Sequence, residues 1–280
     1  MHHLILGYGY CGYYLAQELL EHHQQVTVVS RQLKKELELS KLHHIPHDLE
    51  YPFYWNEPNS IIYYLIPPPS QGTCDTFLKQ FLNQSTLNAK KIIYFGSSGV
   101  YGNHQGAWVD ELSTCLIDSP RQQRRWDAEQ QWLAYCQQHN KELSLLRIAG
   151  IYGPNRIPVD AAKSKIPIIK STEAPFTNHI FVRDLVLIAY LLGQKQTPFT
   201  VYNIADGNPT HMGELQQAVA RVLGIESAPY ESFDQAWEKA SPMKREFMQA
   251  SKRLKIDLLK TALGEDVQFT CMYDAIKQSL

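Results

Sequence analysis

The sequence predicts an α/β fold in which a doubly wound parallel sheet is joined to a smaller C-terminal lobe. In the first half, short apolar runs alternate with amphipathic helical patterns, as β–α–β units require. A glycine-rich turn follows the first apolar run, and the regular alternation ends near Gly153-Pro154. The boundary is therefore placed at residue 155, which gives a first domain at 1–155 and a second lobe at 156–280.

Five apolar runs are expected to form the strands of the sheet. Each is short and nearly continuous, which is typical of a parallel strand that helices cover on both faces. A sixth run at residues 199–204 (Phe199–Ile204) lies in the second half and is expected to return to the main sheet. The five runs are His3–Leu6, Val26–Val29, Ile61–Ile66, Lys91–Phe95 and Ser144–Arg147.

Helical patterns separate these runs. Cys11, Leu15 and Leu19 recur at i, i+4 and i+8, which indicates a helix with one apolar face. Ser119-Pro120 is typical of an N-cap followed by proline at the first helical position, so a further helix is expected to begin there. After the boundary, helices are expected at about 212–223 and near the C-terminus.

The composition is that of an ordinary globular protein. Hydrophobic residues make up 44% and charged residues 20% of the 280 residues. Lys and Arg number 27 against 28 Asp and Glu, so the formal net charge is −1 and nothing favours nucleic acid as a partner. The longest apolar runs are too short to span a membrane, and the chain opens without a signal region.

The cysteines and histidines indicate neither a disulfide framework nor a metal site. Five cysteines stand at irregular spacings without a C-x-x-C pair, so a reduced, cytoplasmic compartment is expected. The densest histidine group, His43, His44 and His47, has no carboxylate or cysteine at ligand spacing. These histidines are expected to lie in a surface loop, and no metal is predicted.

The strongest local signal is the segment Gly7-Tyr8-Gly9-Tyr10-Cys11-Gly12, a G-x-G-x-x-G. It follows a strand, opens a helix and precedes a second strand, as the dinucleotide-binding fingerprint requires. Gly7 would allow the tight turn, Gly9 the approach of the pyrophosphate, and Gly12 the close packing of helix on strand. Backbone N–H groups at the helix start would face the phosphates. The sequence therefore predicts a Rossmann-type domain that binds a nicotinamide dinucleotide.

The end of the second strand indicates which dinucleotide is bound. NAD enzymes usually place an Asp or Glu there, which accepts hydrogen bonds from the ribose hydroxyls. This chain has Ser30 and Arg31 instead, and a guanidinium can pair with a 2′-phosphate while Ser30 donates a hydrogen bond. The sequence therefore favours NADP over NAD, although an ordinary exposed arginine explains Arg31 as well.

Short motifs then follow in collinear order. Ser97-Ser98 with Val100-Tyr101-Gly102 has the form S-S-x-x-V-Y-G, and Leu146-Arg147 precedes Tyr152-Gly153-Pro154. Asn178–Leu185, Tyr202–Asp206 and Ser251-Lys252-Arg253 continue the order, with Phe181 where a histidine is usual. Nearly the whole chain thus resembles the extended short-chain dehydrogenase/reductase family, which contains nucleotide-sugar epimerases and dehydratases. The resemblance implies an NADP-dependent oxidoreductase or epimerase/dehydratase-like enzyme acting on a hydroxyl or carbonyl of a small polar, in some members nucleotide-linked, substrate.

The resemblance also assigns roles to single residues. Ser97 falls at the family's catalytic Ser/Thr position, where its hydroxyl would orient and polarise a substrate oxygen; a strand-end hydroxyl that caps a turn is the structural alternative. Asp48 is in place to contact the adenine amino group, or is an ordinary loop aspartate. Pro67 opens a proline run that is expected to stiffen a loop near the cofactor.

The chain departs from the family at its catalytic Tyr-x-x-x-Lys pair. Aligned on the family's downstream A-E, Arg121 occupies the tyrosine position and Arg125 the lysine position, four residues apart on one helix face. Arg125 could still hold the nicotinamide ribose, whereas Arg121 has no exchangeable proton form at working pH. Tyr101 and Tyr152, at strand ends, are the candidate proton carriers in its place.

The arginines and the missing pair leave two functions open. Arg121, Arg124 and Arg125 together would suit an anionic substrate, or they form a solvated helix face. Loss of the pair supports a catalytically inactive NADP-binding regulator or redox sensor, whereas the Ser97 segment and the intact lobe favour an enzyme. Family members often dimerise, so a homodimer is possible, although core packing explains Trp126 and Trp132 equally well.

Overall fold

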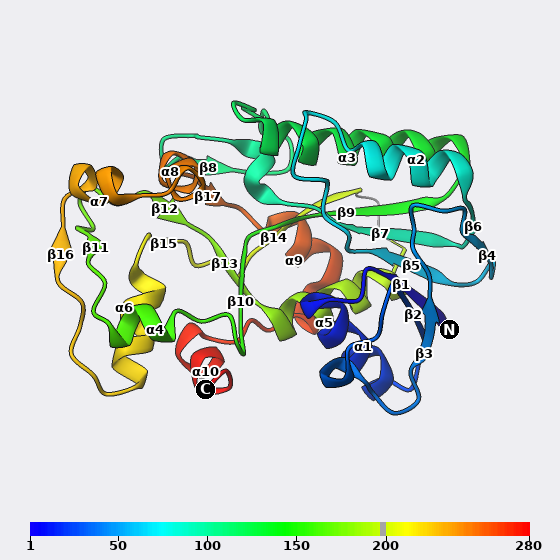
Figure 1. Ribbon diagram of the computed structural model, residues 1–280, viewed down its shortest axis with the longest axis horizontal. Helices are drawn as coiled ribbons and strands as arrows, with labels where there is room; N and C mark the ends of the chain where they lie inside the picture. Colours follow the sequence, from blue (N-terminus) through cyan, green and yellow to red (C-terminus); the bar gives the residue numbers. More distant parts are fainter. Residues whose placement is uncertain (197–199) are drawn as a thin grey trace.

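The computed structural model describes residues 1–196 and 200–280, and it has the predicted α/β architecture (Figure 1). Seven parallel strands form the central sheet in the order β14-β9-β7-β5-β1-β2-β3, so the winding direction reverses between β1 and β5. The predicted doubly wound parallel sheet is confirmed. The strands are β1 (His2–Leu6), β2 (Gln25–Ser30), β3 (His43–Pro46), β5 (Ile61–Tyr64), β7 (Lys91–Phe95), β9 (Glu142–Ile148) and β14 (Val201–Ile204).

The seventh strand comes from the second half of the chain, as predicted. Val201 pairs with Leu145, and the parallel register continues to Ile204 opposite Ile148. Phe199, with which the predicted run begins, lies outside the described residues. β5 ends at Tyr64, two residues before the predicted end, because the chain then runs toward the prolines at 67–69.

The predicted histidine loop is instead part of the sheet. His43–Pro46 forms the edge strand β3, in which Thr27 of β2 pairs with His43 and Ser30 pairs with Pro46. The sequence interpretation failed because this strand is only four residues long and has intermediate or exposed side chains. An edge strand covered on one side lacks the continuous apolar run on which the other strands were recognised.

Helices cover both faces of the sheet (Figure 1). α1 (Tyr10–Glu21) and α5 (Val182–Gln194) pack below it in this view, and α2 (Thr76–Gln84) and α3 (Pro120–Gln138) lie above it. Strand side chains alternate between the two layers. Ile5 belongs to the core under α1 and α5, whereas Leu4 and Leu6 join the core under α2 and α3. Trp132 is fully buried in that second core, so it cannot contribute to a subunit interface.

Helix α3 begins where the sequence predicts. The Ser119 hydroxyl accepts a hydrogen bond from the Gln122 N–H at 3.2 Å, and Pro120 occupies the first helical position. Farther along, Glu129 of α3 and Arg147 of β9 form a buried ion pair, with Nη2 and Oε2 2.9 Å apart. This pair fixes the helix over the strand that follows it.

The remaining elements are short and build mainly the C-terminal lobe, on the left in Figure 1. Within the described residues, no helix is both long and apolar enough to cross a membrane. The predicted helix at 212–223 is confirmed as α6 (Glu214–Val222). The paired short strands are β4 (Tyr54–Asn56) with β6 (Thr86–Asn88), β8 (Trp108–Val109) with β17 (Arg253–Leu254), β10 (Gly150–Tyr152) with β13 (His179–Phe181), β11 (Ile168–Ile169) with β16 (Tyr230–Glu231), and β12 (Phe176–Thr177) with β15 (Thr210–His211). The other helices are α4 (Val159–Lys163), α7 (Phe233–Lys239), α8 (Pro242–Gln249), α9 (Asp257–Leu263) and α10 (Met272–Lys277), with 3₁₀ turns at Lys35–Leu37, Ser98–Tyr101 and Gly264–Asp266.

Candidate functional site

The glycine-rich turn joins β1 to α1, and its three glycines face different surroundings. Gly7 has φ of +97°, and an added Cβ would lie 2.8 Å from Ile66 Cγ1. A Cβ on Gly12 would lie 2.9 Å from the Gly7 carbonyl oxygen, so helix and turn touch there. A Cβ on Gly9 would meet no atom within 4 Å. Gly7 and Gly12 are therefore required by the fold itself, whereas Gly9 leaves open space outside the turn.

A cavity of about 480 Å³ opens beside this turn, at the carboxyl ends of the neighbouring strands. It brings together residues that the sequence singled out from four separate segments. Sequence reasoning missed Glu50, Leu65, Ile66 and Phe77. The predicted residues that line it are Gly7, Tyr8, Gly9, Ser30, Arg31, Asp48 and Pro67.

The residues at and after the end of β2 differ in whether their side chains already have hydrogen-bond partners in the protein. Ser30 Oγ donates to the Gln32 carbonyl at 3.0 Å and lies 3.0 Å from His44 Nε2, so its hydroxyl already has protein partners. Arg31 is exposed and has no hydrogen bond or ion pair within the described residues. Asp48 Oδ1 accepts from the Glu50 N–H at 3.1 Å, which is the geometry of a loop aspartate. Arg31 is therefore the group at this end that is free to meet an anion.

Tyr8, Tyr10 and Cys11 contact other parts of the protein. The Tyr8 hydroxyl donates to the Leu37 carbonyl at 2.9 Å and ties the turn to the loop after β2. The Arg156 guanidinium lies 4.0 Å above the Tyr10 ring. Burial raises the pKa of the Cys11 thiol to about 11, with Arg156 opposing the shift, so Cys11 stays protonated at neutral pH. Tyr10, Cys11 and Gly12 do not line the cavity, and a protonated Cys11 is a poor redox sensor.

Ser97 follows β7 and caps the 3₁₀ turn Ser98–Tyr101. Its Oγ accepts a hydrogen bond from the Gly99 N–H at 3.1 Å, and the side chain is half-buried. Ser97 therefore caps a turn, which the sequence analysis gave as the structural alternative to a catalytic role. An accepting hydroxyl keeps its own proton, so Ser97 retains a donor for a ligand oxygen.

Tyr101 and Tyr152 lie inside the protein rather than at a cleft. The Tyr101 hydroxyl donates to Asn203 Oδ1 at 2.7 Å, and Tyr101 is fully buried. Tyr152 is also buried, and its hydroxyl has no hydrogen-bond partner within the described residues. Burial raises the pKa of both phenols. This geometry argues against the proton-transfer role predicted for each, because neither hydroxyl can meet a substrate without rearrangement.

The three arginines of α3 have separate partners. Arg121 Nη1 lies 3.4 Å from Glu246 Oε1, and its guanidinium stacks on the Phe247 ring at 4.9 Å, so it contacts α8 of the C-terminal lobe. Arg124 Nη1 donates to the Gly72 carbonyl at 2.6 Å. Arg125 makes no hydrogen bond within the described residues, and burial lowers its pKa. The predicted anion-binding trio is therefore reduced to Arg125.

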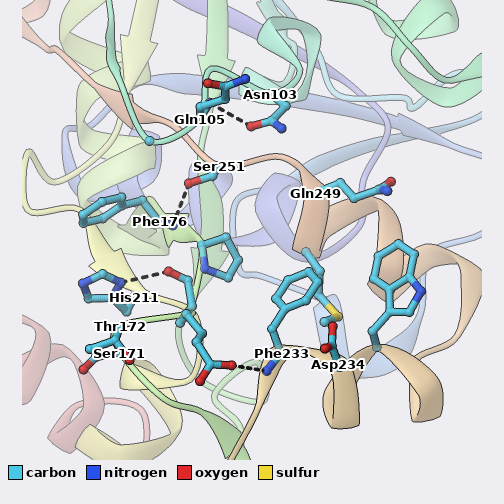
Figure 2. A pocket seen from close by; sticks show the side chains of 16 residues that line it. Asn103, Gln105, Ser171, Thr172, Phe176, His211, Phe233, Asp234, Gln249 and Ser251 are labelled. Carbon is cyan, nitrogen blue, oxygen red and sulfur yellow. Dashed lines mark hydrogen bonds between the residues drawn. The ribbon is translucent and has the colours of Figure 1, made fainter.

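A second cavity, of about 650 Å³, lies beyond the Ser97 turn (Figure 2). Asn103 and Gln105, which follow that turn along the chain, form part of its wall. The rest comes from the 171–176 segment, β15, α7 and the end of α8. Sequence reasoning missed this site, because five separate segments contribute to it and only one of its lining residues, Ser251, belongs to a motif that the sequence singled out.

Lys252 is a further buried group that sequence reasoning left without a role. It is 5% exposed, and its Nζ donates to the Gly102 carbonyl at 3.1 Å, on the loop that links Ser97 to the second cavity. Burial lowers the pKa of Lys252 to about 8, and the Asp118 carboxylate opposes that shift. Lys252 thus holds the loop through a hydrogen bond from a desolvated amine.

No protein-family model and no curated protein matches this chain. Among solved structures, a conserved protein of unknown function from Silicibacter pomeroyi matches with a TM-score of 0.79 and 26% identity, over 99% of this chain and 96% of that chain. A UDP-glucuronic acid 4-epimerase from Bacillus cereus, in complex with UDP-glucuronic acid and NAD, matches with a TM-score of 0.77 and 18% identity, over 100% and 98%. A UDP-glucose 4-epimerase from Thermotoga maritima, with UDP-glucose, gives 0.75 and 17%, over 100% and 97%. The chain therefore has the fold of the family that its motifs resemble.

Proposed function

We propose that this chain, which has the fold of the extended short-chain dehydrogenases/reductases, is a nicotinamide-dinucleotide-dependent oxidoreductase or epimerase/dehydratase-like enzyme. The observation that carries the proposal is the glycine turn, whose open face at Gly9 borders a cavity lined by the ends of β1, β2 and β5. In open parallel sheets, ligands bind at such a switch point of strand order. The Bacillus cereus epimerase structure of the same fold contains NAD.

In this proposal, separate residues of the chain bind the cofactor and orient the substrate. When bound, the nicotinamide supplies the position that gives or takes a hydride. The N–H groups at the start of α1 would bind the pyrophosphate, and Arg125 would hold the ribose near the family's lysine position. Ser97 would donate its hydroxyl proton to an oxygen of the substrate and orient it. The substrate is a small polar molecule with a hydroxyl or carbonyl at the reacting carbon.

We further propose that NADP is the preferred dinucleotide. Its support is the free, exposed guanidinium of Arg31 beside the cavity and the absence of an acid at the end of β2. Replacing Arg31 with alanine should weaken NADPH binding at least about tenfold and leave NADH binding unchanged, because only NADPH carries the 2′-phosphate. Fluorescence titration measures both affinities. Equal affinities of the unaltered protein for NADPH and NADH would overturn the choice of NADP.

The experiment that tests the enzyme is the Ser97→Ala variant, with Ser98→Ala as its matched control. Loss of a positioned hydroxyl donor should lower turnover by about 10²–10³-fold, with NADPH affinity within about twofold of the unaltered protein. Cofactor oxidation and epimerisation are followed across a panel of hydroxyl and carbonyl compounds. An equal rate in Ser97→Ala would remove Ser97 from the mechanism.

A second candidate is a catalytically inactive NADP-binding regulator. The contact of Arg121 with Glu246 favours it, because the family's tyrosine position is occupied by a guanidinium already paired with the other lobe. This function predicts tight NADPH binding without turnover of any compound in the same panel. If the unaltered protein turns over a compound and the Ser97→Ala variant does not, the regulator function is excluded.

A further inference from the structure

The cavity beyond the Ser97 turn is flanked by two stacked pairs of rings. Phe176 and His211 stack with centroids 4.5 Å apart, and Phe233 and Trp237 stack with centroids 5.9 Å apart. Phe176 and His211 lie toward one side of the view in Figure 2, and Phe233 lies toward the other. All four rings line the cavity. Four aromatic rings therefore border a space of about 650 Å³, which suits a ring-shaped ligand.

The nearby cations lie behind these rings and do not line the cavity. Arg253 lies 4.7 Å over the Phe176 ring and donates from Nε to the Gly106 carbonyl at 2.7 Å. Arg245 lies 5.2 Å over the Trp237 ring and donates from Nε to the Trp237 carbonyl at 3.0 Å. Both guanidinium groups are thus held by π faces and backbone oxygens. Within the described residues, neither a lysine nor an arginine lines this cavity.

The polar groups that line the cavity are carboxylates, amides, hydroxyls and the His211 imidazole, whose Nδ1 lies 3.1 Å from the Ala174 carbonyl oxygen. Glu173 and Asp234 contribute its negative charge, and Glu173 Oε2 accepts from the Phe233 N–H at 2.8 Å. The Gln249 amide makes no hydrogen bond within the described residues, and Asn103 keeps its amide donors while its Oδ1 accepts from the Gln105 N–H. Amides and carboxylates can bind the hydroxyls of a neutral ligand.

We propose that this cavity binds an uncharged sugar ring that carries no diphosphate. The inference rests on the proposed function and names its substrate class. The C–H groups of a sugar would pack on the aromatic rings, and its hydroxyls would bind the amides and carboxylates. A diphosphate would meet the Glu173 and Asp234 carboxylates without a lysine or arginine in the lining to compensate, so it would be repelled. The two epimerases of this fold described above contain UDP-sugars, so the ligand class of this chain differs from theirs.

Calorimetric titration tests the ligand class with defined probes, both with and without NADPH. The free-sugar probes are the methyl glycosides of glucose, galactose and N-acetylglucosamine, and the nucleotide probes are UDP-glucose, UDP and uridine. At least one methyl glycoside should bind at least about tenfold more tightly than UDP-glucose. Tighter binding of UDP-glucose, equal binding of uridine, or no binding of any glycoside would each overturn the proposal.

Two pairs of variants connect the binding to this cavity. Trp237→Ala should weaken glycoside binding about tenfold, whereas Tyr230→Ala, which removes an exposed ring outside the cavity, should leave it unchanged. Thr172→Arg adds a cation at the exposed rim and should strengthen UDP-glucose binding, whereas Thr172→Gln should not. Glycoside binding that is equal in Trp237→Ala and the unaltered protein would overturn the proposal, and a thermal melt checks that Trp237→Ala is folded.

The two proposals fail in different ways. Absence of binding of both NADPH and NADH would contradict the proposed function, while the glycoside titration without NADPH still measures the preference of the cavity. Normal NADPH binding together with tighter binding of UDP-glucose would contradict the sugar-ring proposal and leave the proposed function standing.

Discussion

Asp206 is a buried carboxyl two residues after the end of β14. It is 7% exposed, and its Oδ1 accepts from the Asn208 N–H at 2.9 Å. Burial raises the pKa of Asp206 to about 6; the Asp184 carboxylate adds to the shift, and the Asn208 N–H opposes it. The folded protein therefore holds the proton of Asp206 more tightly than the unfolded chain does.

This shift predicts the pH dependence of the Asp206→Asn variant. The stabilisation from the protonated carboxyl is fully present below the unfolded pKa of 3.8 and is lost as the pH rises through about 6. Asparagine keeps an oxygen for the Asn208 N–H but never ionises. The variant should therefore be more stable than the unaltered protein above pH 7, by at most about 3 kcal/mol, and equally stable near pH 4. Urea unfolding at both pH values measures the difference, and a pH-independent difference would refute the argument.

The buried pair of Glu129 and Arg147 gives a second prediction at the scale of single residues. Arg147 also lies 4.8 Å over the Tyr101 ring, so its guanidinium is enclosed on several sides. Glu129→Gln should destabilise the protein by about 3–5 kcal/mol, because it leaves a buried charge without a counter-charge. Glu226→Gln, which breaks the exposed pair with Lys165, should leave the unfolding midpoint unchanged. If Glu129→Gln unfolds at the midpoint of the unaltered protein, this ion pair does not hold α3 to β9.

At the scale of elements, the turn between β1 and α1 separates the needs of the fold from those of a ligand. A Cβ on Gly12 would lie 2.9 Å from the Gly7 carbonyl oxygen, whereas a Cβ on Gly9 would meet no atom of the described residues within 4 Å. Gly9, the residue before helix α1, has φ −114° and ψ −150°, so its backbone is not in the left-handed region that favours glycine. A methyl group at Gly9 therefore tests the space for a ligand, whereas a methyl group at Gly12 tests the packing of the fold.

Gly9→Ala and Gly12→Ala should have opposite effects. Gly9→Ala should leave the thermal midpoint unchanged and weaken NADPH binding at least about tenfold, because the methyl group would occupy the space left for the pyrophosphate. Gly12→Ala should cost about 1–3 kcal/mol of stability, because its Cβ would meet backbone that cannot move freely. Thermal melts of both variants measure the change in stability, and NADPH titrations of both variants measure the change in affinity. Unaltered NADPH affinity in Gly9→Ala would place the pyrophosphate elsewhere.

At the scale of the whole molecule, the second half of the chain completes the first. Leu185 and Ile188 of α5 share one core with Leu15 and Leu19 of α1, and β14 extends the sheet next to β9. A cut at residue 155 would expose these apolar faces to water. The predicted boundary at residue 155 therefore runs through one shared core and does not mark two cores that can fold independently.

The fragment 1–155 should accordingly fail to fold by itself. We expect it to unfold without a cooperative transition in urea, since it lacks both α5 and the seventh strand. Co-expression with the fragment 156–280 should restore a cooperative transition and NADPH binding, because the two pieces can rebuild the shared core. A sharp transition of 1–155 alone would show that the sheet does not need the second half.

The sequence by itself determined the features that are written in neighbouring residues. Continuous apolar runs located the strands, Ser119-Pro120 located the start of α3, and the glycine spacing located the turn beside the first cavity. Each of these signals is local, because strand periodicity, helix capping and turn geometry depend on residues within a few positions of one another. The short edge strand β3 was missed because it has no such continuous run.

Only the tertiary structure decided the partners of side chains and the shape of the second cavity. Arg121 looked free on the helix and is paired with Glu246, 125 residues away, and Tyr101 looked exposed and is buried against Asn203. The wall near Asn103 and Gln105 is completed by α7 and α8, far along the chain. The partner of a side chain depends on how distant segments pack together. The local pattern that places a residue on a helix or strand does not specify which distant residue lies opposite it in the folded chain.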